Sequence, residues 1–394
     1  MTHFFFLLGG IIGALVVALV YITLAANAVA NHQDRVMSLP LIGPELDAFL
    51  RALHGAAGEC VVEGNEVEVL QNGDEVFPPM LAAIRESRST IHFSTYVYWA
   101  GAVPREFAQA LADAAQRGVM VRLVLDTEGT EPMPRELVNQ MREAGCQITW
   151  FRRMQWFDWM KYNQRTHRRL LIVDGKIGFT GGVGIADEWT GHAQSPSHWR
   201  DTNVRLTGPI VAALQGAFTD TWNQSTEELL LDARHFPHLT PTGDVLVCAV
   251  LSTPANGASA AQRVMAALIA GSTRTLYISN AYFVPTPSFI DALCAASDRG
   301  VDVRVLVPGP HGANGQPVRP ATLTSAGFSR MRSMRSWHRN LRDTGWSWGA
   351  THNEGLGPNS ICSAPNLRRA PTRPEAPTTP EARKRFSDHR RPPE

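Results

Sequence analysis

Charged residues are absent from the N-terminal part of the sequence: no Asp, Glu, Lys or Arg occurs from Phe4 to Ala30. A helix of this length could span a bilayer, whose hydrocarbon core needs about 20 apolar residues. A cleaved signal peptide is the alternative, because Ala28-Val29-Ala30 is typical of a cleavage site, but no Lys or Arg precedes the apolar run. We therefore expect an uncleaved single-pass anchor at residues 1–30, which would place the protein in the cell (inner) membrane.

The cysteines show no spacing typical of zinc ligands or of a disulfide framework. The five thiols are scattered along the chain and are compatible with a reduced compartment. They are Cys60, Cys146, Cys248, Cys294 and Cys362.

Large apolar residues are scarce at the other end of the chain. Residues 311–394 contain only eight residues of the types Leu, Ile, Val and Phe, together with thirteen Arg and ten Pro. Their net charge is +8, against −7 for residues 1–310. So little apolar surface cannot offset the entropy of ordering the chain, and we expect an Arg/Pro-rich, disordered tail. Translation in a shifted reading frame is a second explanation for this composition. A basic tail would attract anionic lipid or nucleic acid non-specifically.

One short motif combines several chemically useful residues. His167 is followed two residues later by Arg169, then after an apolar run by Asp174, and then by the pair Gly181-Gly182. Side chains alternate along a strand, so a strand carrying His167 and Arg169 would present both on one face. An ordinary buried strand with polar flanks is the simpler interpretation. The full set of spacings favours a nucleophile or general base beside a cation that binds phosphate, although Asp174 could instead be a turn residue that follows the strand.

Two parts of the sequence repeat each other. Residues 80–94 parallel 265–279, and residues 117–125 parallel 299–307 at an offset of 182 residues. Each copy has the pattern helix, buried strand, loop, helix, buried strand, which predicts an α/β sheet flanked by helices. Further helices are expected at 107–116, 289–297 and about 209–230.

The second copy of the His167 motif is missing. The offset would place its histidine near residue 349, which is a glycine. No histidine after the second repeat is followed by both a cation two residues on and an aspartate seven residues on. The histidines in this part of the chain are His311, His338, His352 and His389.

These motifs resemble those of the phospholipase D superfamily, whose signature is His-x-Lys-x4-Asp followed by a glycine pair. The similarity to bacterial cardiolipin synthases runs from about residue 60 to His311, and the second catalytic motif is absent from it. Besides the His167 motif, it is carried by residues 65–70, 73–75, 77–78, 180–189 and 198–202.

The resemblance implies a fold and its organisation. The fold would be α/β, with a phospholipase D-like mixed sheet flanked by helices and two pseudo-repeated halves, the second incomplete, plus one N-terminal transmembrane helix. We expect five segments: an anchor at 1–30, a connecting segment at 31–72, the first half with its catalytic motif at 73–238, the start of the second half at 239–310, and the atypical tail at 311–394.

The resemblance also implies roles for individual residues. His167 would attack phosphorus and form a phosphohistidine, Arg169 would take the place of the phosphate-binding lysine, and Asp174 would complete the catalytic motif. Asp201 stands where the family often has the carboxylate that orients the nucleophile, a role that fixes the imidazole tautomer. Gly181, Gly182 and Glu188 would support the site. Two departures from the family pattern are Arg169 in place of lysine and Gly184 in place of asparagine.

The implied activity is that of a membrane-anchored phosphatidyltransferase acting on phosphatidylglycerol, with phospholipid and membrane as partners and with no metal or other cofactor. A phospholipase D-type hydrolase would use the same intermediate. A single-motif phosphodiesterase or nuclease would pair two histidines in a homodimer, although no specific nucleic-acid partner is expected. The third alternative is an inactive truncated or frameshifted member of the family, since losing one catalytic half removes the general acid.

Overall fold

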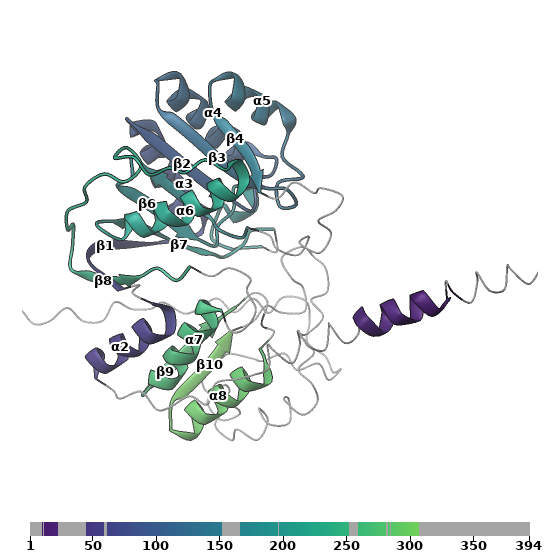
Figure 1. Ribbon diagram of the computed structural model, residues 1–394. Helices are drawn as coiled ribbons and strands as arrows, with labels where there is room; N and C mark the ends of the chain where they lie inside the picture. Colours follow the sequence, from purple (N-terminus) through teal and green to yellow (C-terminus); the bar gives the residue numbers. More distant parts are fainter. Residues whose placement is uncertain are drawn as a thin grey trace, which may run out of the picture. The chain divides into compact units, whose positions relative to one another are not determined.

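The computed structural model describes residues 10, 12–22, 45–58, 61–151, 166–195, 197–251, 259–280, 283 and 285–306 (Figure 1). Two compact units divide the chain at Met334/Arg335, and the described residues all belong to the first. Its elements are α2 (Leu46–Ala57), β1 (Val61–Gln71), α3 (Asn72–Glu86), β2 (Thr90–Thr95), α4 (Ala102–Gln116), β3 (Met120–Asp126), α5 (Arg135–Glu143), β4 (Gln147–Phe151), β5 (Leu170–Val173), β6 (Ile177–Gly181), η2 (Asp187–Trp189), β7 (Thr202–Thr207), α6 (Val211–Thr226), β8 (Val245–Cys248), α7 (Ala260–Gly271), β9 (Thr275–Ser279), α8 (Pro287–Asp298) and β10 (Asp302–Leu306).

A mixed eight-stranded sheet forms the larger part of the described structure. Its strand order is β4-β3-β2-β5-β6-β7-β1-β8. The pairs β2–β3 and β3–β4 are parallel, and the others are antiparallel. Every residue of β2 and of β5 is buried, as expected for central strands covered on both faces. The predicted α/β class and the mixed sheet flanked by helices are confirmed.

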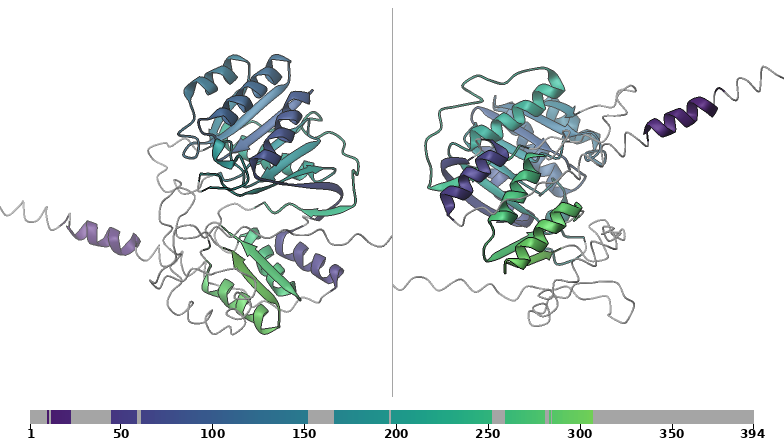
Figure 2. Two further views of the ribbon diagram at one scale, coloured as in Figure 1. Left: turned by 180° about the vertical axis from the view of Figure 1, so that it is seen from behind. Right: turned by 60° about the horizontal axis from the view of Figure 1, so that its bottom comes forward.

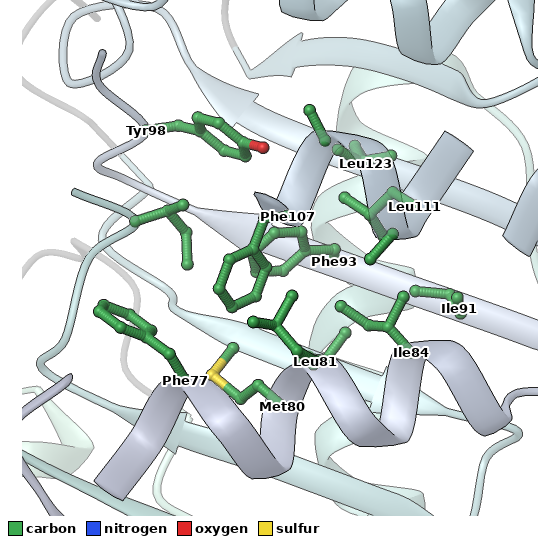
Figure 3. Close-up of a cluster of buried hydrophobic side chains, with 14 of the residues drawn as sticks. Phe77, Met80, Leu81, Ile84, Ile91, Phe93, Tyr98, Phe107, Leu111 and Leu123 are labelled. Atoms are coloured by element: carbon green, nitrogen blue, oxygen red, sulfur yellow. The ribbon is translucent and has the colours of Figure 1, made fainter. Parts of the chain in front are cut away.

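Helices cover both faces of this sheet (Figure 2). On one face, α3, α4 and α5 enclose the larger apolar core, and on the other face α6 packs over β2, β3, β4 and β5. The apolar positions of α3 are spaced at three and four residues, so they form a single stripe directed at the sheet. Figure 3 shows this stripe against Ile91 and Phe93 of β2 and Phe107 of α4. The stripe consists of Phe77, Met80, Leu81 and Ile84. This packing fixes β2, which pairs with β5, the apolar strand within the His167 motif.

The second repeat forms a smaller unit of the same local pattern. α7 and α8 alternate with β9 and β10, which pair in parallel from Thr275–Asp302 to Ser279–Leu306. Its core includes Leu293 and Val303. The helices and strands predicted for this repeat are therefore present. The tail at 311–394 lies outside the described residues, so the structure does not test its predicted disorder.

The predicted membrane helix is described only in part. Residues 12–22 are helical, and their large apolar side chains are exposed. Among the residues described, no helix combines the length and the apolar character needed to cross a bilayer. Most of the remaining predicted anchor, including residues 1–9 and 23–30, lies outside the described residues.

Cys248 at the end of β8 corrects the expectation drawn from cysteine spacing. It is disulfide-bonded. Cys146 is a free, buried thiol.

Candidate functional site

His167 and Arg169 of the predicted motif lie directly before the central strand β5. β5 begins at Leu170, one residue later than a strand carrying Arg169 requires, but the backbone still alternates its side chains. Arg168 points toward α6, where its Nη1 donates to the carbonyl oxygen of Ala217 at 2.8 Å and to Asp220 at 2.8 Å. His167 and Arg169 are in hydrogen-bond contact with each other, as the alternation predicted.

Two side chains from neighbouring strands hold the backbone of this segment. Ser94 of β2 donates its hydroxyl to the carbonyl oxygen of Arg168 at 3.2 Å, and Thr180 of β6 donates to that of Arg169 at 3.0 Å. On the N-terminal side, the amide of Thr166 donates to the buried carboxylate of Asp126 at 3.1 Å. The motif is therefore fixed from three separate strands.

His167 and Arg169 form the chemical centre of the site. Nη1 of Arg169 lies 3.1 Å from Nδ1 of His167. Burial, and then the nearby guanidinium, lower the pKa of His167 to about 4, while the charge of Asp201 acts in the opposite direction. The imidazole is therefore neutral near pH 7, which is the form that can act as a nucleophile. The guanidinium beside it can bind the oxygens of a phosphate.

Asp201 is held close to this pair without a hydrogen bond to it. The indole N–H of Trp189 donates to Oδ2 of Asp201 at 3.1 Å, and the amide of Thr202 donates to Oδ1 at 2.8 Å. No hydrogen bond between Asp201 and His167 occurs among the described residues. Asp201 thus interacts with the imidazole through its charge, and Trp189 and the backbone hold its carboxylate in place.

The glycine pair allows this close packing. A Cβ at Gly182 would lie 2.1 Å from Oδ1 of Asp201, and one at Gly181 would lie 2.1 Å from Oδ1 of Asn203. That Asn203 oxygen accepts a hydrogen bond from the amide of Val183 at 3.0 Å. Glycine is therefore needed at both positions so that β7 and the residues before it can approach the end of β6.

Gly184, where the family pattern has asparagine, is closely surrounded by other side chains. A Cβ there would lie 2.7 Å from Cβ of Val97 and 2.8 Å from the indole of Trp189. Trp189 packs edge-on against Trp199 with ring centroids 4.8 Å apart. The aromatic rings leave no space for a side chain at residue 184.

Glu188 lies in η2, beside the same aromatic rings. Its carbonyl oxygen accepts a hydrogen bond from the amide of Trp199 at 2.6 Å. Its Oε2 is buried and has no hydrogen-bond partner within the described part of the chain. The backbone of Glu188 therefore connects η2 to the loop that carries Asp201.

Asp174 is not brought together with His167. It follows β5, whereas His167 precedes it, so the length of the strand separates them. Its carboxylate accepts hydrogen bonds from three consecutive amides, of Arg88 at 3.0 Å, Ser89 at 2.7 Å and Thr90 at 2.9 Å. Its φ of 52° places it in the left-handed region, which Asp tolerates in turns. In this structure Asp174 closes the connection between α3 and β2, as the turn interpretation predicted.

Tyr96 belongs to the site but was not identified from the sequence. The centroids of its ring and the His167 ring are 4.7 Å apart, and Cζ of Arg169 lies 5.8 Å from the Tyr96 centroid. The available indication was that Tyr96 directly follows a predicted buried strand. That strand had to be paired with β5 before the proximity could be recognised.

The described residues do not suggest a metal centre. Within them, no group of three or more His, Cys, Asp or Glu side chains is arranged to hold a metal ion. The chemistry available at the site is that of an imidazole, a guanidinium and a carboxylate.

Comparison with known proteins gives a consistent result. The family model described as "Cardiolipin synthase, PLD-like domain" matches residues 80–222 and 265–347. The chain is 34% identical over 262 residues to Cardiolipin synthase A of Pseudomonas putida, covering 66% of this chain and 54% of that protein. It is 31% identical to the Probable cardiolipin synthase YwiE of Bacillus subtilis (strain 168), covering 62% and 49%.

A solved structure supports the fold alone. The phosphatidylserine synthase of Haemophilus influenzae Rd KW20 superimposes with a TM-score of 0.52 at 11% identity, covering 75% of each chain. The chain spans about half the length of the curated relatives it matches, with 49% and 54% of the two named above.

Proposed function

The chain belongs to the family described as "Cardiolipin synthase, PLD-like domain", and we propose that it is a phosphatidyltransferase that uses His167 as its nucleophile. Its substrate would be phosphatidylglycerol, because the relatives it matches carry the name cardiolipin synthase. The observation that carries the proposal is the contact between a neutral imidazole and a guanidinium across 3.1 Å.

The reaction proceeds in two displacements at phosphorus. In the first, the imidazole of His167 forms a bond to phosphorus, the bond from phosphorus to the glycerol oxygen breaks, and the departing oxygen takes a proton from water so that glycerol leaves. In the second, the hydroxyl oxygen of another phosphatidylglycerol forms a bond to phosphorus, the bond from phosphorus to the imidazole nitrogen breaks, and the hydroxyl proton passes to water, giving cardiolipin and free imidazole. Arg169 neutralises charge on the phosphate oxygens in both steps. Asp201 stabilises the positive charge that the imidazole acquires.

The membrane and domain assignments are part of the same proposal. The uncharged segment at residues 1–30 would anchor the protein in the cell (inner) membrane as a single pass, where its lipid substrate is present. The first phospholipase D-like half would occupy residues 73–238, and the second would begin at residues 239–310. A homodimer would allow two chains to contribute one histidine each.

The missing second motif favours a second candidate, an inactive family member. In the family, the histidine of that motif protonates the leaving alcohol, and losing a general acid reduces the rate by about 10²–10⁴-fold. The two candidates make opposite predictions for the lipid products of the intact chain.

The test uses membranes from a host that makes no cardiolipin of its own and expresses the full chain. These membranes are incubated with labelled phosphatidylglycerol, and the lipid products are separated by thin-layer chromatography. We expect cardiolipin and glycerol from the wild type and from His54→Ala, whose histidine is exposed on α2, and neither product from His167→Ala. Phosphatidic acid in place of cardiolipin would identify a hydrolase. If neither the wild type nor H167A forms any product, the chain is the inactive form.

A further inference from the structure

A single aromatic side chain contacts both reacting groups of the site. Tyr96 directly follows β2, and β2 pairs with β5 so that Ser94 lies opposite Leu170. Residues just after β2 therefore lie beside residues just before β5. The Tyr96 ring is tilted by 48° to the His167 ring at a centroid distance of 4.7 Å, and the Arg169 guanidinium lies 5.8 Å from the same centroid.

The backbone on either side keeps Tyr96 in this position. A Cβ at Gly129 would lie only 2.0 Å from the carbonyl oxygen of Tyr96, so the loop after β3 packs directly on the Tyr96 backbone. The Trp99 indole donates to the carbonyl oxygen of Gly129 at 3.0 Å, which ties the two loops together. Thr95 donates its hydroxyl to the carbonyl oxygen of Val97 at 2.9 Å and fixes the turn around Tyr96.

The ring acts on both neighbours through simple physical effects. An aromatic face excludes water from an adjoining imidazole and restricts its rotation, and ring pairs prefer such tilted arrangements. The same ring attracts a guanidinium electrostatically. A ligand phosphate needs the nucleophilic nitrogen and the guanidinium at a fixed separation, because small misplacements of reacting groups cost large factors in rate.

We propose that Tyr96 is a positioning residue that holds the His167 imidazole and the Arg169 guanidinium together as one phosphate-binding unit. The proposal rests on the proposed function, in which these two groups act on the same phosphate. Tyr96 itself forms no bond to the reacting atoms. Its aromatic face, and not its hydroxyl, performs this role.

The experiment compares Tyr96→Leu and Tyr96→Phe with the wild-type full chain in membranes. Carbethoxylation of the peptide containing His167 is followed by mass spectrometry from pH 4 to 8, because only the neutral and accessible imidazole reacts. We expect Y96L to raise the reaction rate of His167 at pH 7 roughly 3- to 10-fold, as expected for the loss of one ring contact. It should also move the midpoint of the pH profile toward the ordinary value, because burial contributes most to lowering the pKa of His167. Y96F should match the wild type in both.

A matched control excludes a general effect of removing a tyrosine. Tyr277 is an exposed tyrosine of β9, in the other sheet, and Tyr277→Leu should leave the His167 profile unchanged. An unchanged profile in Y96L, or a Y96F profile that follows Y96L, would overturn the proposal. Thermal melts monitor folding, and because other histidines are read in the same digest, a Y96L variant that unfolds would accelerate all of them and not His167 alone.

The lipid assay on the same samples separates this proposal from the proposed function. If the wild type makes cardiolipin, Y96L should lower kcat by a similar roughly 3- to 10-fold factor, with a smaller change in KM, and Y96F should retain activity. If the wild type makes no product, the proposed function fails, while the His167 profile still decides the role of Tyr96.

Discussion

Arg169 donates a hydrogen bond from Nη1 to Nδ1 of His167 across 3.1 Å. A guanidinium does not give up its protons, so Nδ1 must accept, and the neutral ring carries its own proton on Nε2. The Nδ1 lone pair is therefore engaged by Arg169. In the proposed reaction, a phosphate oxygen that accepts from Arg169 in place of Nδ1 would release this lone pair.

The first prediction concerns this pair. Removing the guanidinium in Arg169→Ala should raise the pKa of His167 above about 4, because the Arg169 charge is the second largest cause of its lowering after burial. Arg169→Lys should retain part of the effect, since it keeps the charge. Histidine NMR titration would measure the change, with Arg51→Ala on the exposed face of α2 as a control that leaves the titration unaltered. A pKa that does not rise in R169A would show that the two side chains are not adjacent in solution.

Asp174 provides a prediction about stability. Asp174→Ala removes the acceptor for three backbone amides, those of Arg88, Ser89 and Thr90. We expect a loss of about 2–3 kcal/mol in the free energy of unfolding, because these amides lose a charged acceptor. Asp174→Asn should lose less, since asparagine tolerates the positive φ and keeps one acceptor oxygen. Denaturant unfolding gives the stability, and the pH profile of His167 modification should be unchanged in folded D174N.

Gly182 offers a test of the site's packing. A Cβ in Gly182→Ala would overlap Oδ1 of Asp201, so the carboxylate must move from its present position. Because the charge of Asp201 raises the pKa of His167, its displacement should lower that pKa further and reduce phosphatidyl transfer at least 10-fold. The matched control is Gly216→Ala in α6, where a Cβ meets nothing within 4 Å. That change should stabilise the helix by about 0.5–1 kcal/mol and leave the activity intact. Equal activity of both variants would contradict the arrangement described for Asp201.

The buried His92 leads to a prediction about pH. Burial, followed by the nearby charge of His235, lowers the pKa of His92 to about 3, although the hydrogen bond that its Nδ1–H donates to Oε1 of Gln215 at 2.8 Å acts in the opposite direction. Arg122 also lowers this pKa, and Asp232 raises it. Between pH 6.5 and about 3 the unfolded chain binds a proton at this residue and the folded chain does not. Stability is therefore fully present above pH 6.5 and is lost as the pH falls toward 3.

The variant that isolates this effect is His92→Gln. Its free energy of unfolding should depend less on pH between 6 and 4 than that of the wild type, by up to about 1.4 kcal/mol per pH unit. Urea titrations at several pH values measure the two slopes. Identical slopes would show that His92 is accessible to protons in the folded protein.

Much of the secondary structure followed from local patterns. The predicted apolar run at Leu170–Val173 is β5, and the expected helices at 107–116 and 289–297 correspond to α4 (Ala102–Gln116) and α8 (Pro287–Asp298). These predictions succeeded because periodic burial is encoded by neighbouring residues. The position of His167 beside Arg169 followed from the same alternation.

The remaining relationships of the site depend on which strands pair, and no local pattern contains that information. Tyr96 reaches His167 because β2 pairs antiparallel with β5, across about seventy positions of sequence. The same pairing places Asp174, at the end of β5 far from the imidazole, beside the connection between α3 and β2. There its carboxylate accepts hydrogen bonds from three backbone amides.

The sequence by itself therefore determined the kind of chemistry, since the residue types and their spacing specify an imidazole beside a cation. The tertiary structure decided which carboxylate lies near that imidazole and which accepts the amides of a turn. It did so because a strand separates Asp174 from His167, whereas Gly182 lets Asp201 approach it.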